Sequence, residues 1–303
     1  MKKILLVLCT TIFAFALEVP SNHIVSTTWL EKNQSNKNLV IIDTRTTKEF
    51  EQSHLKNAVN FPKKLWFQGK LGTVPKTFNT PLQVNEMFSK AGISEDSTIV
   101  FYHAGLKDKD FADAASGLWT AMLYGMNKVA ILNGGFEKWR DEKKNVTSQK
   151  TKIEPTEFEV EAFNPSILAA LSDVMNAQYS DDIQITDARV AKFYRGEDDR
   201  KDLARHGRIP TAKLTPMIRQ AKKVGTHFEF LSKEEASKTL NNSGYGLELD
   251  QSAIVYCNTG HKARGLWFVS KFIIGMKDVK VYDASIVEYS RTLLAMEDGE
   301  AMD

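Results

Sequence analysis

The sequence contains two copies of one pattern, and this repeat limits the folds that the chain can adopt. Residues 41–45 (IIDTR) correspond to residues 185–189 (ITDAR), since each is an apolar run that ends in Asp-x-Arg. A histidine follows in both copies, His54 in the first and His206 in the second. A chance likeness would not keep such features in the same order, so we interpret the pattern as an internal duplication.

The match resumes further along each copy. Residues 99–102 (IVFY) correspond to residues 253–256 (AIVY), and both are short apolar runs rich in strand-forming residues. A helical segment follows in each copy, with Gly-Leu-Trp at 117–119 and at 265–267. Strands that alternate with helices are typical of α/β domains, in which the sheet is largely parallel and helices flank it.

The length of the chain agrees with a duplication. At 303 residues it exceeds the ~100–200 residues of one domain. We therefore predict two tandem α/β domains, at residues 22–142 and 163–295, each with a largely parallel sheet flanked by helices. Residues 143–162 are polar and rich in lysine, which is typical of a linker. Four aromatic residues on the predicted helices are expected in the core: Trp119, Trp267, Phe268 and Phe272.

The first residues have the pattern of an export signal. Lys2 and Lys3 precede an uncharged apolar run at 4–15, and small residues follow at the positions that a signal peptidase recognises. We predict a signal peptide at residues 1–16 and an exported protein, periplasmic or secreted. The run is well short of the ~20 residues of a membrane-spanning helix, so no membrane association is expected after cleavage.

Cleavage would change the charge and the cysteine count. Loss of the two lysines lowers the formal net charge from +2 to zero, which gives no electrostatic reason to bind nucleic acid. Cys9 would also be removed, and Cys257 would be the only cysteine of the mature chain. Because one cysteine cannot form an internal disulfide, Cys257 is either buried filler or a reactive group.

The neighbours of Cys257 favour a reactive thiol. Cys257 follows the second apolar strand and is followed by the polar loop Asn258-Thr259-Gly260-His261-Lys262. Gly260 allows the loop to curl, so that its amides and the start of the next helix can face a negative charge. Lys262 adds a full positive charge, and together these groups favour the ionised form of the sulfur. We predict an exposed, nucleophilic thiolate.

The first copy lacks this nucleophile. His103 stands where the second copy has Cys257, and a longer charged segment follows it before the helix. The duplication therefore predicts one active and one inactive domain.

These motifs resemble the rhodanese superfamily, and specifically its two-domain sulfurtransferases. The resemblance extends from about Ile24 to Arg291 and is most specific at residues 256–263 and 187–189. In that family the first domain commonly lacks the cysteine. The resemblance implies that Cys257 takes a sulfane sulfur from a small anionic donor, thiosulfate first, and holds it as a persulfide. Cyanide, a thiol or a protein would then accept the sulfur, and no metal or organic cofactor is implied.

The resemblance also suggests roles for other residues. Substrate binding is assigned to the loop residues Asn258, Thr259, Gly260, His261 and Lys262. Relatives have a donor-binding arginine a few residues after the Asp-x-Arg motif, and this chain has Phe193 at that position. The nearby cations Lys192 and Arg195 are therefore assigned to substrate binding as well. Asp187 with Arg189, and Asp43 with Arg45, are interpreted as structural ion pairs. The loop is neither the basic loop of animal thiosulfate enzymes nor the Gly-Val-Thr loop of mercaptopyruvate enzymes, so 3-mercaptopyruvate stays an alternative donor.

Two other kinds of protein also use a reactive cysteine. A cysteine phosphatase needs an arginine six positions after the cysteine to hold phosphate, whereas Ala263 occupies that position and Arg264 comes one residue late. A sulfur carrier or redox-sensing module that binds a partner without turnover would also use a reactive thiol. Catalytic turnover distinguishes that module from an enzyme.

Overall fold

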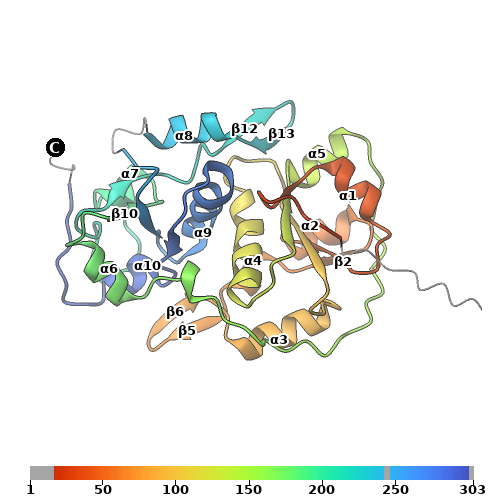
Figure 1. Ribbon diagram of the computed structural model, residues 1–303, viewed down its shortest axis with the longest axis horizontal. Helices are drawn as coiled ribbons and strands as arrows, with labels where there is room; N and C mark the ends of the chain where they lie inside the picture. Colours follow the sequence, from red (N-terminus) through yellow and green to blue (C-terminus); the bar gives the residue numbers. More distant parts are fainter. Residues whose placement is uncertain (1–16, 242–245, 300–303) are drawn as a thin grey trace, which may run out of the picture.

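The computed structural model of the chain describes residues 17–241 and 246–299, and it places two similar halves side by side (Figure 1). The predicted signal peptide at 1–16 lies outside the described residues. Within the described residues, no helix combines the length and apolar character that crossing a membrane requires.

The first half is built on a five-stranded parallel sheet. Its strand order is β1 (Ile24–Val25), β8 (Val129–Leu132), β7 (Thr98–Tyr102), β2 (Leu39–Asp43) and β4 (Ala58–Asn60). The helices of this half are α1 (Thr27–Asn33), α2 (Thr47–Gln52), α3 (Pro81–Lys90), α4 (Phe111–Leu123) and α5 (Gly135–Asp141). Every residue of β7 is buried, which explains why its sequence is a continuous run of strand-forming residues with no polar alternation.

The second half repeats this arrangement. Its four-stranded parallel sheet has the order β11 (Lys213–Leu214), β10 (Ile183–Asp187), β14 (Ser252–Tyr256) and β15 (Val279–Val281). Its helices are α6 (Leu171–Ala177), α7 (Ala191–Tyr194), α8 (Lys233–Asn241), α9 (His261–Phe268) and α10 (Ser285–Tyr289). The register is the same in both halves: Asp43 pairs with Tyr102 and Asp187 with Tyr256. The duplication and the predicted α/β fold are confirmed.

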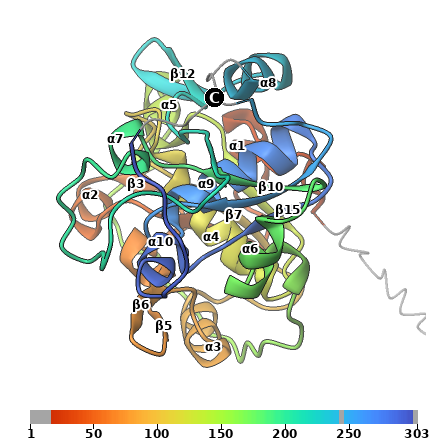
Figure 2. The ribbon, with the colours of Figure 1, turned by 90° about the vertical axis from the view of Figure 1, so that its left-hand side faces the viewer.

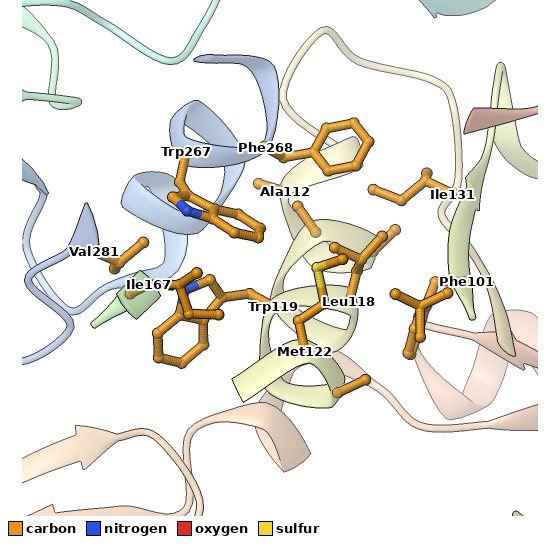
Figure 3. Close-up of a cluster of buried hydrophobic side chains, with 14 of the residues drawn as sticks. Phe101, Ala112, Leu118, Trp119, Met122, Ile131, Ile167, Trp267, Phe268 and Val281 are labelled. Atoms are coloured by element: carbon orange, nitrogen blue, oxygen red, sulfur yellow. The ribbon is translucent and has the colours of Figure 1, made fainter. Parts of the chain in front are cut away.

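The two halves share one hydrophobic core. Helices α4 and α9 lie side by side between the sheets (Figure 1 and Figure 2), and Gly265 permits the approach because a Cβ there would lie 3.1 Å from the Cβ of Ala112. Trp119, Trp267 and Phe268 are fully buried in the cluster that Figure 3 shows. Their predicted core role is confirmed, whereas Phe272 is only partly buried against the cluster.

Each half also extends a hairpin onto the other. In the first half, β5 (Gly69–Leu71) and β6 (Val74–Thr77) form a hairpin whose Val74 joins the core of the second half. In the second half, β12 (Ala221–Val224) and β13 (His227–Phe230) form a hairpin that reaches α5. There the Phe228 amide donates to the Gly105 carbonyl at 2.8 Å. We call this arrangement the reciprocal hairpins.

The predicted linker is fastened to the first half. Its strand β9 (Val146–Thr147) pairs antiparallel with β3 (His54–Leu55). Further along, Phe158 is buried against Phe88, with 5.1 Å between the ring centroids, and its amide donates to Ser89 Oγ at 3.0 Å. The polar composition therefore reflects exposed side chains on an anchored segment.

Candidate active site

A pocket lies where the carboxyl ends of both sheets meet. Its volume is about 1020 Å³, and it is lined by residues of the segments 44–47, 62–64, 104–113 and 257–262. These segments follow β2, β4, β7 and β14, and in parallel sheets ligands bind at this end of the strands. Both halves therefore build the pocket.

Cys257 lies in the wall of this pocket. It follows β14 directly, lines the cavity and is 2% exposed. The prediction of an exposed thiol is therefore wrong, because the residue packs into the shared hydrophobic core. Its remaining contact with the pocket is what brings the residue to a ligand.

Ser285 holds the Cys257 loop in its curled shape. Its Oγ accepts hydrogen bonds from the amides of Cys257 and Gly260, both at 3.1 Å, and donates to the Tyr282 carbonyl at 2.8 Å. These two amides are therefore not part of the expected ring around the sulfur. Ser285 lies 28 residues beyond Cys257 in the chain, and no motif in the sequence connects the two.

Four other loop amides remain available to an anion. The N–H groups of Asn258, Thr259, His261 and Lys262 have no hydrogen-bond acceptor within residues 17–241 and 246–299. They stand on the pocket wall at the start of α9, where the helix dipole also favours negative charge. The anion cradle predicted from sequence is thus smaller than expected but present.

Gly260 is required by its backbone and by its neighbours. Its φ is +78°, and a Cβ there would lie 2.2 Å from Asp283 Oδ1. We expect Gly260→Ala to lower the free energy of unfolding by more than the roughly 1–2 kcal/mol of a left-handed backbone, and to reduce activity, because the carboxylate must move. The control is Gly72→Ala, which has φ of +57° with nothing within 4 Å. Equal losses in urea denaturation would contradict the role of the close contact.

The pocket is strongly basic. Ten of its lining residues are charged, seven of them basic and three acidic. The basic ones are Arg45, Lys63, Lys64, Lys76, Lys107, Arg200 and Lys262, and the acidic ones are Glu49, Asp110 and Asp113. A cleft with such an excess of one sign attracts small anions.

Three cations lie within electrostatic range of the Cys257 sulfur. Burial lowers the pKa of Lys262, and negative charge on Cys257 opposes this shift. Burial likewise lowers the pKa of Arg264, opposed first by Asp283 and then by Cys257. Although burial opposes it, Asp187 raises the pKa of Arg189, and Cys257 adds to this effect. These three side chains therefore place positive charge around the sulfur.

His261 connects the catalytic loop to the first half. Its Nε2 lies 2.7 Å from Asp113 Oδ1 and its Nδ1 lies 3.0 Å from Lys63 Nζ. The Phe67 ring meets the imidazole edge-on, with 5.8 Å between the centroids. Burial lowers the pKa of His261, although Asp113 acts in the opposite direction. The imidazole is thus fixed between two side chains of the other half.

The two Asp-x-Arg pairs have the same buried geometry. Arg189 Nη2 lies 2.7 Å from Asp187 Oδ2, and the same nitrogen donates to the Gly207 carbonyl. Arg45 Nη2 lies 2.6 Å from Asp43 Oδ2 and donates to the Ser53 carbonyl. These contacts agree with the predicted structural role, and Arg45 additionally lines the pocket.

The two cations predicted to grip the donor lie elsewhere. Arg195 pairs with Glu197 at 2.7 Å, and Lys192 is exposed with its Nζ over the Phe193 ring. Neither lines the pocket, whereas Arg200 does. Counting residues from the Asp-x-Arg motif missed Arg200 because α7 ends at Tyr194 and the chain then continues without regular structure.

Arg264 has no access to a ligand. It is fully buried, donates to Asp283 Oδ1 through Nε and Nη2, and donates to the Trp66 carbonyl through Nη1. An arginine held in this way cannot grip a phosphate in the pocket. Its position gives a structural reason against the phosphatase alternative.

The first half has no nucleophile at the matching position. His103 is buried, and neither ring nitrogen has a hydrogen-bond partner among the residues that the structure describes. Burial lowers its pKa to about 4, although Asp113 opposes the shift. A buried imidazole therefore occupies the position that Cys257 has in the second half. Among residues 17–241 and 246–299, no group of three or more His, Cys, Asp or Glu side chains is placed to hold a metal ion.

Comparison with curated proteins finds relatives of nearly the same length. A protein of Mycolicibacterium smegmatis named "Putative thiosulfate sulfurtransferase" is 28% identical over 276 residues, which cover 89% of this chain and 95% of that protein. The sulfur carrier protein TtuD of Thermus thermophilus is 26% identical over 276 residues, covering 88% and 93%.

Comparison with solved structures agrees on the fold. The crystal structure of SseA from Escherichia coli, described as a 3-mercaptopyruvate sulfotransferase with the rhodanese fold, superimposes with a TM-score of 0.74 at 24% identity. The match covers 87% of this chain and 98% of SseA. The family model for the rhodanese-like domain matches this chain twice, at residues 26–142 and 170–292. These matches cover most of the chain, and the chain belongs to the rhodanese family.

Proposed function

We propose that this protein is a sulfurtransferase that moves a sulfane sulfur from a small anionic donor to an acceptor through a persulfide on Cys257. The observation that carries the proposal is the position of Cys257 in the wall of a basic pocket, beside four amides that have no acceptor in the described part of the chain. This arrangement attracts an anion, holds negative charge on sulfur and leaves a nucleophile within reach.

The reaction takes two balanced steps. The Cys257 thiolate attacks the outer sulfur of thiosulfate, the S–S bond of the donor breaks, and sulfite leaves with the bonding electrons. Cyanide or a thiolate then attacks the outer sulfur of the persulfide, the Cys257 S–S bond breaks, and the thiolate is restored. Free amides at the loop stabilise the anionic sulfur in both steps. Neither step requires a further oxidant or reductant.

Thiosulfate is the donor that the pocket favours. It carries two negative charges, and the pocket has four more basic than acidic lining residues. Lys262 faces the same cavity and is close enough for Cys257 to influence its pKa. The name of the mycobacterial relative points the same way. 3-Mercaptopyruvate, the substrate class in the description of SseA, is the second candidate, because its carboxylate suits the same cations.

We also propose that the protein acts outside the cytoplasm. The support is the basic, apolar and small-residue pattern of residues 1–16. Fractionation of cells that express the full chain, with N-terminal sequencing of the product, tests this: retention in the cytoplasm with Met1 intact would contradict export.

The persulfide is the direct test of the proposed function. Purified protein mixed with thiosulfate is expected to gain the mass of one sulfur atom, and peptide mapping is expected to locate it on Cys257. Parallel rates of thiocyanate formation from thiosulfate and 3-mercaptopyruvate would identify the donor. A Cys257 that gains no sulfur from either donor would refute the proposal.

Turnover distinguishes the enzyme from a carrier. Repeated thiocyanate formation per protein molecule is expected of an enzyme. A single stoichiometric transfer would instead favour a carrier, the role named for the Thermus relative.

A further inference from the structure

We infer that the first half, although it has no nucleophile, supplies part of the donor-binding site: Lys63, held in place by His261 and Asp113, binds the oxyanion end of the sulfur donor. The inference rests on the proposed sulfurtransferase function and extends it to a residue outside the Cys257 loop. Lys63 and His261 are 198 residues apart in the chain, so their contact joins the two halves.

The positions of the hydrogen atoms follow from the contacts. A lysine ammonium only donates, so His261 Nδ1 must be the acceptor in the 3.0 Å contact with Lys63 Nζ. The proton of the neutral imidazole is then on Nε2, which donates to Asp113 Oδ1 at 2.7 Å. Burial lowers the pKa of His261, which agrees with a neutral ring. The three side chains are thus linked by two hydrogen bonds, from Lys63 to His261 and from His261 to Asp113.

The three linked side chains hold the Lys63 ammonium group at the pocket. Lys63 belongs to the short helix η1 (Lys63–Trp66), and its side chain is half exposed on the pocket lining. One of its three N–H groups is used by His261, and Asp113 lies at 3.9 Å. The other donors have no hydrogen-bond acceptor among residues 17–241 and 246–299, so they can bind an anion that enters between Lys63 and the Cys257 loop.

The ordering distinguishes Lys63 from the other lysines of the pocket. A flexible lysine loses side-chain entropy when it binds a ligand, and a lysine already held by a neighbour loses less. The adjacent Lys64 also lines the pocket and is exposed, and within the described residues it has no hydrogen bond to His261. It therefore provides a matched control for charge without positioning.

The test compares Lys63→Met with Lys64→Met at constant ionic strength. A hydrogen bond to a charged group contributes about 1.5 kcal/mol or more, so Lys63→Met is expected to raise KM for thiosulfate about 10-fold. The kcat should change by less than about 2-fold, because Cys257 is untouched. Lys64→Met is expected to raise KM by less than about 3-fold. Equal effects of the two variants would overturn the inference.

Variants of His261 test the positioning. His261→Leu removes the acceptor for Lys63 and should raise KM as Lys63→Met does, whereas His261→Gln keeps an acceptor and a donor and should restore most of the affinity. In the Lys63→Met/His261→Leu double variant the two effects should not add, because both act on one contact. Additive effects would overturn the inference.

Two further measurements separate possible failures. The variants should unfold in urea with the same cooperative transition as the wild-type protein, which shows that they are folded. If the wild-type protein forms no persulfide, the proposed function fails. If it does and Lys63→Met leaves KM unchanged, only the role of Lys63 fails.

Discussion

Replacement of Cys257 by serine is expected to lower thiocyanate formation from thiosulfate and cyanide by at least about 10³-fold. A serine hydroxyl is not ionised at neutral pH and cannot hold a persulfide. The measurement is a steady-state rate at saturating donor.

The control for this variant is its stability. Cys257 is 2% exposed and the exchange of sulfur for oxygen is small, so the cooperative unfolding transition should persist. A folded Cys257→Ser protein that still turns over would exclude covalent catalysis at this residue.

The second large effect is expected from the buried ion pair between Arg264 and Asp283. Arg264 Nη2 lies 2.8 Å from Asp283 Oδ1, and both side chains are at most 1% exposed. The pair also connects the halves, since Arg264 donates to the Trp66 carbonyl and the Phe78 amide donates to Asp283 Oδ2. Arg264→Leu should lower the free energy of unfolding by about 3–5 kcal/mol, because Asp283 is left buried without a counter-charge. Urea denaturation measures the loss.

A second variant identifies the cause. Adding Asp283→Leu to Arg264→Leu removes the uncompensated charge, so part of the lost stability should return. Lys90→Ala breaks the exposed pair with Glu86 and is expected to leave the transition unchanged. A loss of similar size in Lys90→Ala, or no recovery in the double variant, would contradict the explanation.

Local patterns in the sequence predicted the fold well. Strands β2 and β10 each end at the aspartate of an Asp-x-Arg motif. The two apolar runs are β7 and β14, because a buried parallel strand needs a continuous run of apolar residues. Cys257 and its loop were located for the same reason, since the loop directly follows such a strand.

Contacts between distant segments could not be predicted in this way. Ser285 reaches the Cys257 loop through the packing of α10 within the second half, and Lys63 reaches it through the packing of the two halves. Nothing near either residue in the chain indicates these contacts. Counting residues from the Asp-x-Arg motif points to Lys192 and Arg195 as donor-binding cations. Such a count fails here because the chain leaves regular structure after α7. The burial of Cys257 was also missed, because it depends on the core that the halves share.

The reciprocal hairpins have a consequence for how the duplicated chain can change. Val74 of the first half completes the core of the second, and the β12–β13 hairpin fastens the first-half loop that contains Gly105. Neither copy is therefore structurally complete by itself. Because each copy supplies part of the packing of the other, substitutions that disturb the copy without the cysteine are expected to weaken the reactive copy as well.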